Sequence, residues 1–324
     1  MALRRANLST CARIPADRYI AGCLERGHRT QKVIHSSSLA LPKACFTKLA
    51  VLMNGWGIYN IDQLRAQGFV RRDIDRLVSV GDLRRLSRGW YATSDADPRV
   101  AEAIRFRARV GCLTGCDLHG VWVPPTPRSH VLAGSKRLPL LPSHLLWHPW
   151  GETQPNQPIF PLQDCLQQVL HRHDAETALI CLESAANRRL ISVDEATALI
   201  ASAPVKRRSA LRFFDPKAES GVETRVRLYL QRRGVAVDSQ VQIPGVGRAD
   251  LVAGSLVIEC DGRRYHSEDD AFDRDRERDL QTMRAGHRWL RLSYSQVFSR
   301  WASTQEALSD ILQTRRHRSK SKPV

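Results

Sequence analysis

The sequence is most informative between residues 248 and 261, where it is Arg248-Ala-Asp-Leu-Val-Ala-Gly-Ser-Leu-Val-Ile-Glu-Cys-Asp261. Two runs typical of strands are separated only by Gly254-Ser255, the spacing of a β-hairpin with a two-residue turn. Pairing about this turn places Asp250 directly opposite Glu259. It also leaves the opposite face of both strands apolar, so the pattern predicts a half-buried hairpin that carries paired carboxylates.

Two carboxylates directly across a strand pair repel each other and destabilise the sheet. A bound divalent cation compensates for this, because Mg²⁺ takes oxygen ligands from one or two carboxylates and keeps sites for water and phosphate. The same pattern also fits a turn longer by one residue, two solvated acids, or an ion pair from Arg248 to one of the acids. Of these four arrangements, the pattern favours a metal site at Asp250 and Glu259.

The residues before the hairpin predict a helix and a further strand. Ser220-Gly-Val-Glu223 begins a helix with an inward apolar stripe that ends at Gly234, and a strand follows over 238–243. Glu223 lies three residues after Ser220, so helix capping accounts for it as well as a role in the site does.

This helix, hairpin and following strand resemble the PD-(D/E)XK nuclease superfamily, and most closely its very-short-patch-repair-like branch. The residues that carry the resemblance are Glu223, Ala249-Asp250-Leu-Val252, Val257-Ile-Glu-Cys-Asp-Gly262, His266, Arg274 to Leu280, Gly286 and Leu290-Arg-Leu292. The resemblance implies a restriction-endonuclease-like α/β domain over 219–312 with a central mixed sheet.

The same resemblance implies roles for single residues. Asp250 and Glu259 would bind Mg²⁺ or Mn²⁺, and Glu223 would support the site from the helix. Asp261 stands where the superfamily usually has lysine, and His266 matches the second of two histidines of the repair-like branch. These two residues would handle protons during hydrolysis of a DNA phosphodiester.

Residues 45–98 show the pattern of a winged helix-turn-helix. Apolar periodicity predicts helices from Phe46 to Met53, after Asn60, and from Val70 to Val80. A hairpin with its turn at Arg88-Gly89 follows. In this fold the third helix fits the DNA major groove and the wing lies along the phosphates.

Six arginines fall on the predicted recognition helix and wing, which favours DNA binding over a purely protein-binding role. They are Arg71, Arg72, Arg76, Arg84, Arg85 and Arg88.

Residues 45 to about 205 resemble the AbiEi-type antitoxins of bacterial type IV toxin-antitoxin systems. The matching features are Gly68, Arg76-Leu77, Gly81, Arg88-Gly89-Trp-Tyr91, Leu113-Thr-Gly115 and Leu118-His-Gly120. The resemblance implies promoter binding through the winged helix and neutralisation of a cognate nucleotidyltransferase toxin.

The middle region, 99–215, carries no catalytic pattern and is predicted to be α/β. We expect a helix over 101–110, strands near 129–133 and 144–147, and then two helices, the second after Ser192. Its histidines, including His119, His130, His144 and His148, are predicted to be structural. Cys112 and Cys116 are predicted to be buried at helical spacing rather than to join His119 in a zinc site.

The net charge, the apolar runs and the cysteines of the sequence indicate which partners and which compartment to expect. The 324 residues carry a formal charge of +17, which favours a polyanionic partner such as nucleic acid over a membrane surface. No apolar run is long enough to span a membrane. The eight cysteines are scattered, as in a reducing compartment, so we expect a cytoplasmic protein.

Two basic segments lie outside the predicted domains. Residues 1–44 fit a disordered arm, an organellar transit peptide or an extension from a misplaced start codon, and 313–324 form a basic tail.

Overall the sequence predicts an α/β, or α+β, protein that binds DNA and has a metal-dependent endonuclease domain. The alternative is a non-enzymatic antitoxin or regulator with a degenerate nuclease domain.

Overall fold

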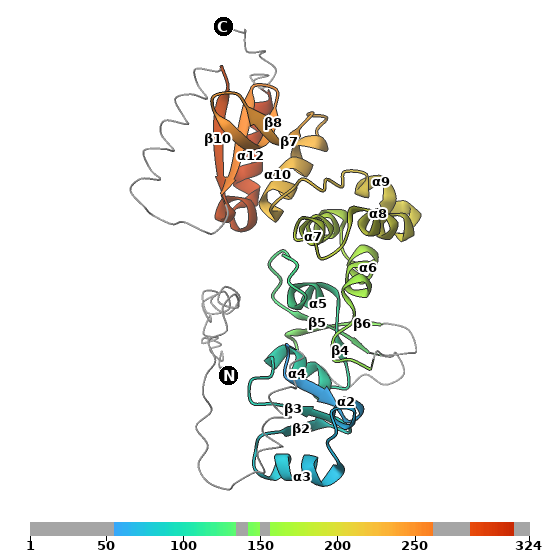
Figure 1. Cartoon of the computed structure of the whole chain (residues 1–324). Coiled ribbons are helices and arrows are strands. Elements are labelled where there is room, and N and C mark those ends of the chain that lie inside the picture. The colour runs from blue at the N-terminus through green and yellow to red at the C-terminus, as the bar shows by residue number, and fades with distance from the viewer. Residues whose placement is uncertain (1–54, 134–141, 150–155, 262–285, 314–324) are drawn as a thin grey trace, which may run out of the picture. The chain divides into compact units, whose positions relative to one another are not determined.

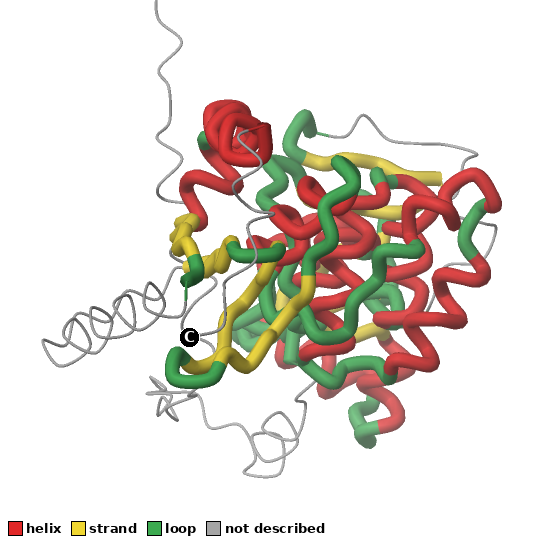
Figure 2. Tube along the Cα trace, turned by 90° about the horizontal axis from the view of Figure 1, so that it is seen from above, coloured by secondary structure: helices red, strands yellow, loops and turns green. Residues whose placement is uncertain are grey.

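The structure is a computed structural model that describes residues 55–133, 142–149, 156–261 and 286–313. All of them belong to one compact unit spanning 48–324. Helices and strands both contribute, as Figures 1 and 2 show, and the described part contains three sheets. The fold is therefore mixed α/β, as the sequence predicts.

The winged-helix region consists of β1 (Ile58–Asn60), α2 (Ile61–Ala66), α3 (Arg71–Ser79), β2 (Arg84–Ser87) and β3 (Trp90–Ala92). A capping box opens α2, since the Asn60 side chain accepts the Gln63 N–H at 2.8 Å and the Gln63 side chain accepts the Asn60 N–H at 2.9 Å. The helix predicted from Val70 to Val80 is present as α3, and its Ile74 and Leu77 are buried.

The sequence did not predict β1. This strand pairs with β3 on the side opposite β2, so the wing belongs to a three-stranded sheet of order β1-β3-β2. Three residues are too few for a strand periodicity to stand out, and only the partner strand reveals it. The helix predicted from Phe46 to Met53 lies outside the described residues.

The middle region begins with α4 (Pro98–Arg105), β4 (Arg109–Val110), α5 (Cys112–Leu118), β5 (Ser129–Ala133) and β6 (Leu145–Pro149). The helix predicted over 101–110 is wrong at both ends. It starts earlier because the Asp97 side chain caps it and Pro98 takes its first turn, and it ends earlier because Arg107 has a φ of 56°. Arg109 and Val110 form β4, which pairs with β5.

Four helices follow, where the sequence predicts two: α6 (Leu162–Arg172), α7 (Ala175–Asn187), α8 (Val193–Ser202) and α9 (Val205–Leu211). The cap predicted at Ser192 is present and opens α8. Asp174 divides α6 from α7, because its side chain accepts the N–H of Thr177 and starts a new helix.

The C-terminal region contains α10 (Gly221–Gln231), β7 (Asp238–Ile243), β8 (Gly247–Ala253), β9 (Leu256–Asp261), β10 (Arg288–Ser293), the π-helix η3 (Ser295–Ser299) and α12 (Trp301–Gln313). The sheet order is β10-β9-β8-β7, and only the β10–β9 pairing is parallel. This confirms the predicted mixed sheet. Its apolar face packs on α10 and α12 through residues such as Leu251, Ile258 and Val226.

The hydrophobic cores cross the region boundaries drawn from the sequence. Ile58 and Trp90 of the winged-helix sheet share a core with α4 and β5, and Leu228 of α10 joins the core of α5 to α9. The three regions are thus parts of one packed unit. None of the described helices is both long and apolar enough to cross a membrane.

Candidate functional site

The β8–β9 hairpin has the register that the sequence predicts around Gly254-Ser255. Ala253 pairs with Leu256, Val252 with Val257 and Leu251 with Ile258. The ladder then stops before the expected pair of Asp250 and Glu259. Instead, Oδ2 of Asp250 accepts the backbone N–H of Cys260 at 2.8 Å. The direct opposition of the two acids is therefore replaced by a side-chain contact that holds the Asp250 carboxylate against β9.

Glu223 reaches the same part of the sheet from the first turn of α10. Its backbone N–H is capped by Ser220 Oγ at 3.2 Å, which confirms the predicted cap. Its carboxylate is only 3% exposed and accepts the Glu219 N–H at 3.0 Å. Burial, with a further contribution from the negative charge of Asp250, raises the pKa of Glu223 to about 7.

Gln240 of β7 completes this group. It lies between the pairs Ser239–Leu251 and Val241–Ala249, which brings it level with Asp250. Its Nε2 donates a 2.8 Å hydrogen bond to Oε2 of Glu223. Its Oε1 is buried and has no hydrogen-bond partner among the described residues. Gln240 also has a φ of 55°, the left-handed region that non-glycine residues rarely occupy.

Glu259 and Asp261 lie on β9, the first half-buried and the second exposed at the end of the strand. The negative charges of Asp250, Glu223, Glu259 and Asp261 all act on the buried Cys260 thiol. Burial first, and then these charges, raise the pKa of Cys260 well above its usual value. Arg248 binds Glu219 through two hydrogen bonds of 2.7 and 2.9 Å.

The donor atoms present suit a hard divalent cation. Asp250 and Glu259 offer carboxylate oxygens, and Gln240 Oε1 is a buried amide oxygen that lacks a partner within the described ranges. Mg²⁺ is commonly held by one or two carboxylates and completed by water. In the described part of the chain, no three of the acids have ligand atoms within 4.8 Å of one another. The acids therefore do not form a complete metal-binding site by themselves.

His266 and the segment Arg274 to Leu280 lie outside the described residues. Of the predicted site, the structure links Glu223 to Asp250 through Gln240 and places Glu259 and Asp261 on the neighbouring strand β9.

The six predicted DNA-binding arginines are all exposed. Arg71, Arg72 and Arg76 lie on α3, Arg84 and Arg85 on β2, and Arg88 at the turn to β3. Arg71 is 3.7 Å from Asp75 in an exposed i,i+4 pair, a weak interaction that leaves its charge accessible. Helix and wing thus present cations to solvent, as the sequence predicts.

Sequence reasoning missed two sets of functional candidates. The sequence predicts Gln240 only as a strand residue that could contact DNA, and its left-handed backbone and contact with Glu223 have no local sequence signal. The second set is a group of ligand-type side chains in the middle region: Cys112, His130, His148 and His173. Cys116 is buried on α5 as predicted, and His119 binds the Phe160 carbonyl at 2.8 Å.

Comparisons with known proteins give little further information. No family model matches the chain, and no curated protein matches it. Among the solved structures, three chains match. One is the RV2827C protein from Mycobacterium tuberculosis, which is 15% identical over 53% of this chain and 78% of its own, with a TM-score of 0.26. At this TM-score the likeness bears on neither fold nor function.

Proposed function

We propose that the chain is a metal-dependent DNA endonuclease whose active site is formed by α10, β7, β8 and β9. The observation that carries the proposal is that Asp250, held by the Cys260 N–H, lies level with Gln240, which binds the buried carboxylate of Glu223. Burying carboxylates close to one another costs free energy unless something compensates for their charge. A divalent cation does so, and it can also assist phosphodiester hydrolysis.

In this proposal Asp250 and Glu259 hold Mg²⁺ or Mn²⁺, and Gln240 Oε1 is a further oxygen donor. The cation, when bound, neutralises charge on the scissile phosphate and lowers the pKa of a bound water. The hydrogen bond from Cys260 N–H fixes one oxygen of the Asp250 carboxylate. Glu223 does not bind the cation itself in this proposal. It orients Gln240 through the 2.8 Å hydrogen bond.

Proton transfer falls to the remaining acids and bases. Asp261 is exposed at the end of β9, where it can exchange a proton with solvent and with the attacking water. His266 is the proposed second acid or base, because an imidazole titrates near neutral pH.

DNA would be held by the winged-helix region. The exposed arginines of α3 and β2 supply the positive charge that phosphates attract, and α3 has the exposed face that a recognition helix needs. A DNA partner also agrees with the formal charge of +17.

A second candidate function is supported by two observations. Asp261 occupies the position where the nuclease superfamily usually has lysine, and the described acids do not converge within 4.8 Å. Both fit a DNA-binding regulator or antitoxin, with a cognate toxin as partner, in which the nuclease-like region has lost activity.

Plasmid cleavage separates the two candidates. Supercoiled plasmid and short duplexes would be incubated at low salt with the full chain in Mg²⁺, Mn²⁺ or EDTA. The test variant is Asp250→Asn, which keeps an acceptor for the Cys260 N–H but removes the charge. The matched control is Asp238→Asn, an exposed aspartate at the start of β7.

The nuclease proposal expects metal-dependent nicking that Asp250→Asn loses and Asp238→Asn keeps. Equal cleavage by wild type and Asp250→Asn would contradict the assignment of the site. Duplex binding without cleavage in any metal would favour the regulator.

A further inference from the structure

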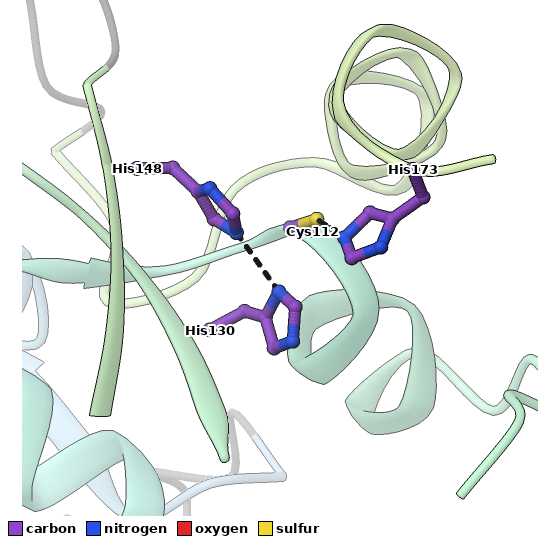
Figure 3. A group of neighbouring side chains, drawn as sticks. All are labelled: Cys112, His130, His148 and His173. Atoms are coloured by element: carbon purple, nitrogen blue, oxygen red, sulfur yellow. Dashed lines mark hydrogen bonds between the residues drawn. The ribbon is translucent and has the colours of Figure 1, made fainter. Parts of the chain in front are cut away.

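Four side chains that are typical ligands of transition metals converge in the middle region (Figure 3). Cys112 is the first residue of α5, His130 lies on β5, His148 on β6, and His173 is the C-terminal cap of α6. One ligand atom from each lies within 4.8 Å of the other three. No other such group of three or more exists among the described residues.

The distances are close to those of a tetrahedral site. Cys112 Sγ is 3.1 Å from His173 Nε2, and His130 Nδ1 is 2.9 Å from His148 Nε2. Zinc bonds of about 2.0–2.3 Å to nitrogen and sulfur place neighbouring ligand atoms roughly 3.3–3.8 Å apart in a tetrahedron. On binding an ion, the distances within the two close pairs of ligand atoms would increase slightly, and the longer distances between the other ligand atoms would decrease. Small side-chain rotations are therefore enough to admit one ion.

The surroundings of the four residues suit a soft or borderline cation. Cys112 is fully buried and His130 is 1% exposed, while His148 and His173 are half-buried. Sulfur and imidazole nitrogen are the donor atoms that soft and borderline cations prefer.

The backbone at Cys112 supports a functional role independently. Its φ is 51°, in the left-handed region, which costs a non-glycine residue about 1–3 kcal/mol. The fully buried Gln168 holds it there, since Oε1 of Gln168 accepts the Cys112 N–H at 2.7 Å. In this conformation Cys112 Sγ lies 3.1 Å from His173 Nε2 (Figure 3).

His130 also has a contact suited to a ligand. Its Nδ1 faces the cluster, and its Nε2 is 3.4 Å from Thr126 Oγ1. Metal-bound histidines commonly donate their second ring N–H to such an acceptor, which fixes the tautomer and the ring orientation.

We propose that Cys112, His130, His148 and His173 form a structural zinc site. Four protein ligands close the coordination sphere and leave no position for substrate, as in zinc sites that stabilise folds. A thiolate with three imidazoles favours Zn²⁺ over Mg²⁺, which prefers oxygen ligands. The ion would tie together α5, β5, β6 and the end of α6, whose ligands span residues 112 to 173.

The site is separate from the acids of the C-terminal sheet, and the proposal does not depend on nuclease activity. The full chain, purified without a histidine tag, would be loaded with Zn²⁺, dialysed and measured for bound zinc by mass spectrometry. Wild type is expected to hold about one zinc per chain, and Cys112→Ser and His148→Asn less than about a tenth of that.

The control variants replace metal-ligand types of side chain that lie outside the proposed zinc site. His144→Asn and His171→Asn remove exposed histidines of the same region that are outside the cluster, and Asp250→Asn disables the proposed Mg²⁺ site. All three are expected to retain one zinc. Loss of zinc from Asp250→Asn alone would place the ion in the C-terminal sheet and overturn the proposal.

A measurement on wild type alone guards against variants that fail to fold. Co²⁺ in place of zinc should give intense visible bands of a tetrahedral ion and a thiolate-to-cobalt charge-transfer band in the near ultraviolet. A strong chelator should also lower the melting temperature of the zinc-loaded protein. Wild type that binds neither zinc nor cobalt, or a cobalt spectrum without the thiolate band, would refute the site.

Discussion

Gln240 Nε2 donates a 2.8 Å hydrogen bond to Oε2 of Glu223 and so links the outer strand of the C-terminal sheet to the first turn of α10. The bond has a cost, because Gln240 has a left-handed φ of 55° and its Oε1 is buried without a partner among the described residues. Strained residues with unsatisfied buried atoms cluster at functional sites. For this reason we include Gln240 with the acids of the proposed site.

The Gln240–Glu223 bond should be visible in stability. Gln240→Ala removes a hydrogen bond to a carboxylate, so the free energy of unfolding should fall by about 1–3 kcal/mol in urea denaturation. Gln242→Ala, on the same strand but exposed, is the matched control and should stay within about 0.5 kcal/mol of wild type. Equal effects of the two substitutions would show that the bond contributes nothing specific.

Glu223 should make stability depend on pH in a metal-free buffer. Its pKa is raised from 4.5 to about 7, so the folded state binds this proton more tightly than the unfolded state. The stabilising contribution is complete below pH 4.5 and is lost as the pH rises through 7. The shift corresponds to about 3 kcal/mol.

The comparison is between wild type and Glu223→Gln, by urea denaturation in EDTA from pH 4.5 to 8. Wild type should lose stability relative to the variant across this window. Parallel curves would mean that the Glu223 carboxyl is not buried as described.

A buried ion pair between α7 and α10 gives a third prediction. Arg227 Nη2 is 2.6 Å from Glu183 Oε1, and both side chains are 1% exposed. Arg227→Met leaves the Glu183 carboxylate buried and unpaired, which should lower the free energy of unfolding by about 3–5 kcal/mol. The control is Arg232→Met at the C-terminal cap of the same helix, whose pair with Glu176 is partly exposed and should be worth at most about 1 kcal/mol.

The double variant Glu183→Gln/Arg227→Met tests the cause. It removes both charges but keeps one oxygen that can accept the Asp215 N–H, while the amide NH2 can donate to Thr224 Oγ1. Recovery of most of the lost stability would assign the effect to the unpaired charge. An equally unstable double variant would instead assign it to lost packing.

Local interactions explain what could be predicted from the sequence. The caps at Asn60, Ser192 and Ser220 and the turn at Gly254-Ser255 depend on residues within four positions of one another, and all are present. The position of the hairpin turn determines which face of β8 and β9 carries the acids. Hence the hairpin and the positions of Asp250 and Glu259 on it could be predicted, whereas the mixed sheet was expected from the family resemblance.

Contacts between distant residues explain what could not. Cys112 meets His173 across 61 positions, and no spacing in the sequence marks either as a ligand. Asp250 contacts the Cys260 N–H instead of extending the ladder to Glu259, which hairpin symmetry does not foresee. These outcomes are set by tertiary packing and not by local propensity.

The last prediction concerns the exposed arginines of α3. If Arg72 and Arg76 contact phosphates, Arg72→Ala/Arg76→Ala should weaken binding to duplex DNA of any sequence. Each lost phosphate contact should reduce the slope of log affinity against log salt by about 0.9, or about 2 for the pair. Fluorescence anisotropy from low to moderate salt measures this slope. Lys206→Ala, an exposed cation on α9, is the control and should leave the slope unchanged. If the two variants lose equal slope, the arginines contribute only to the general charge of the protein, and the winged helix is not the DNA-binding surface.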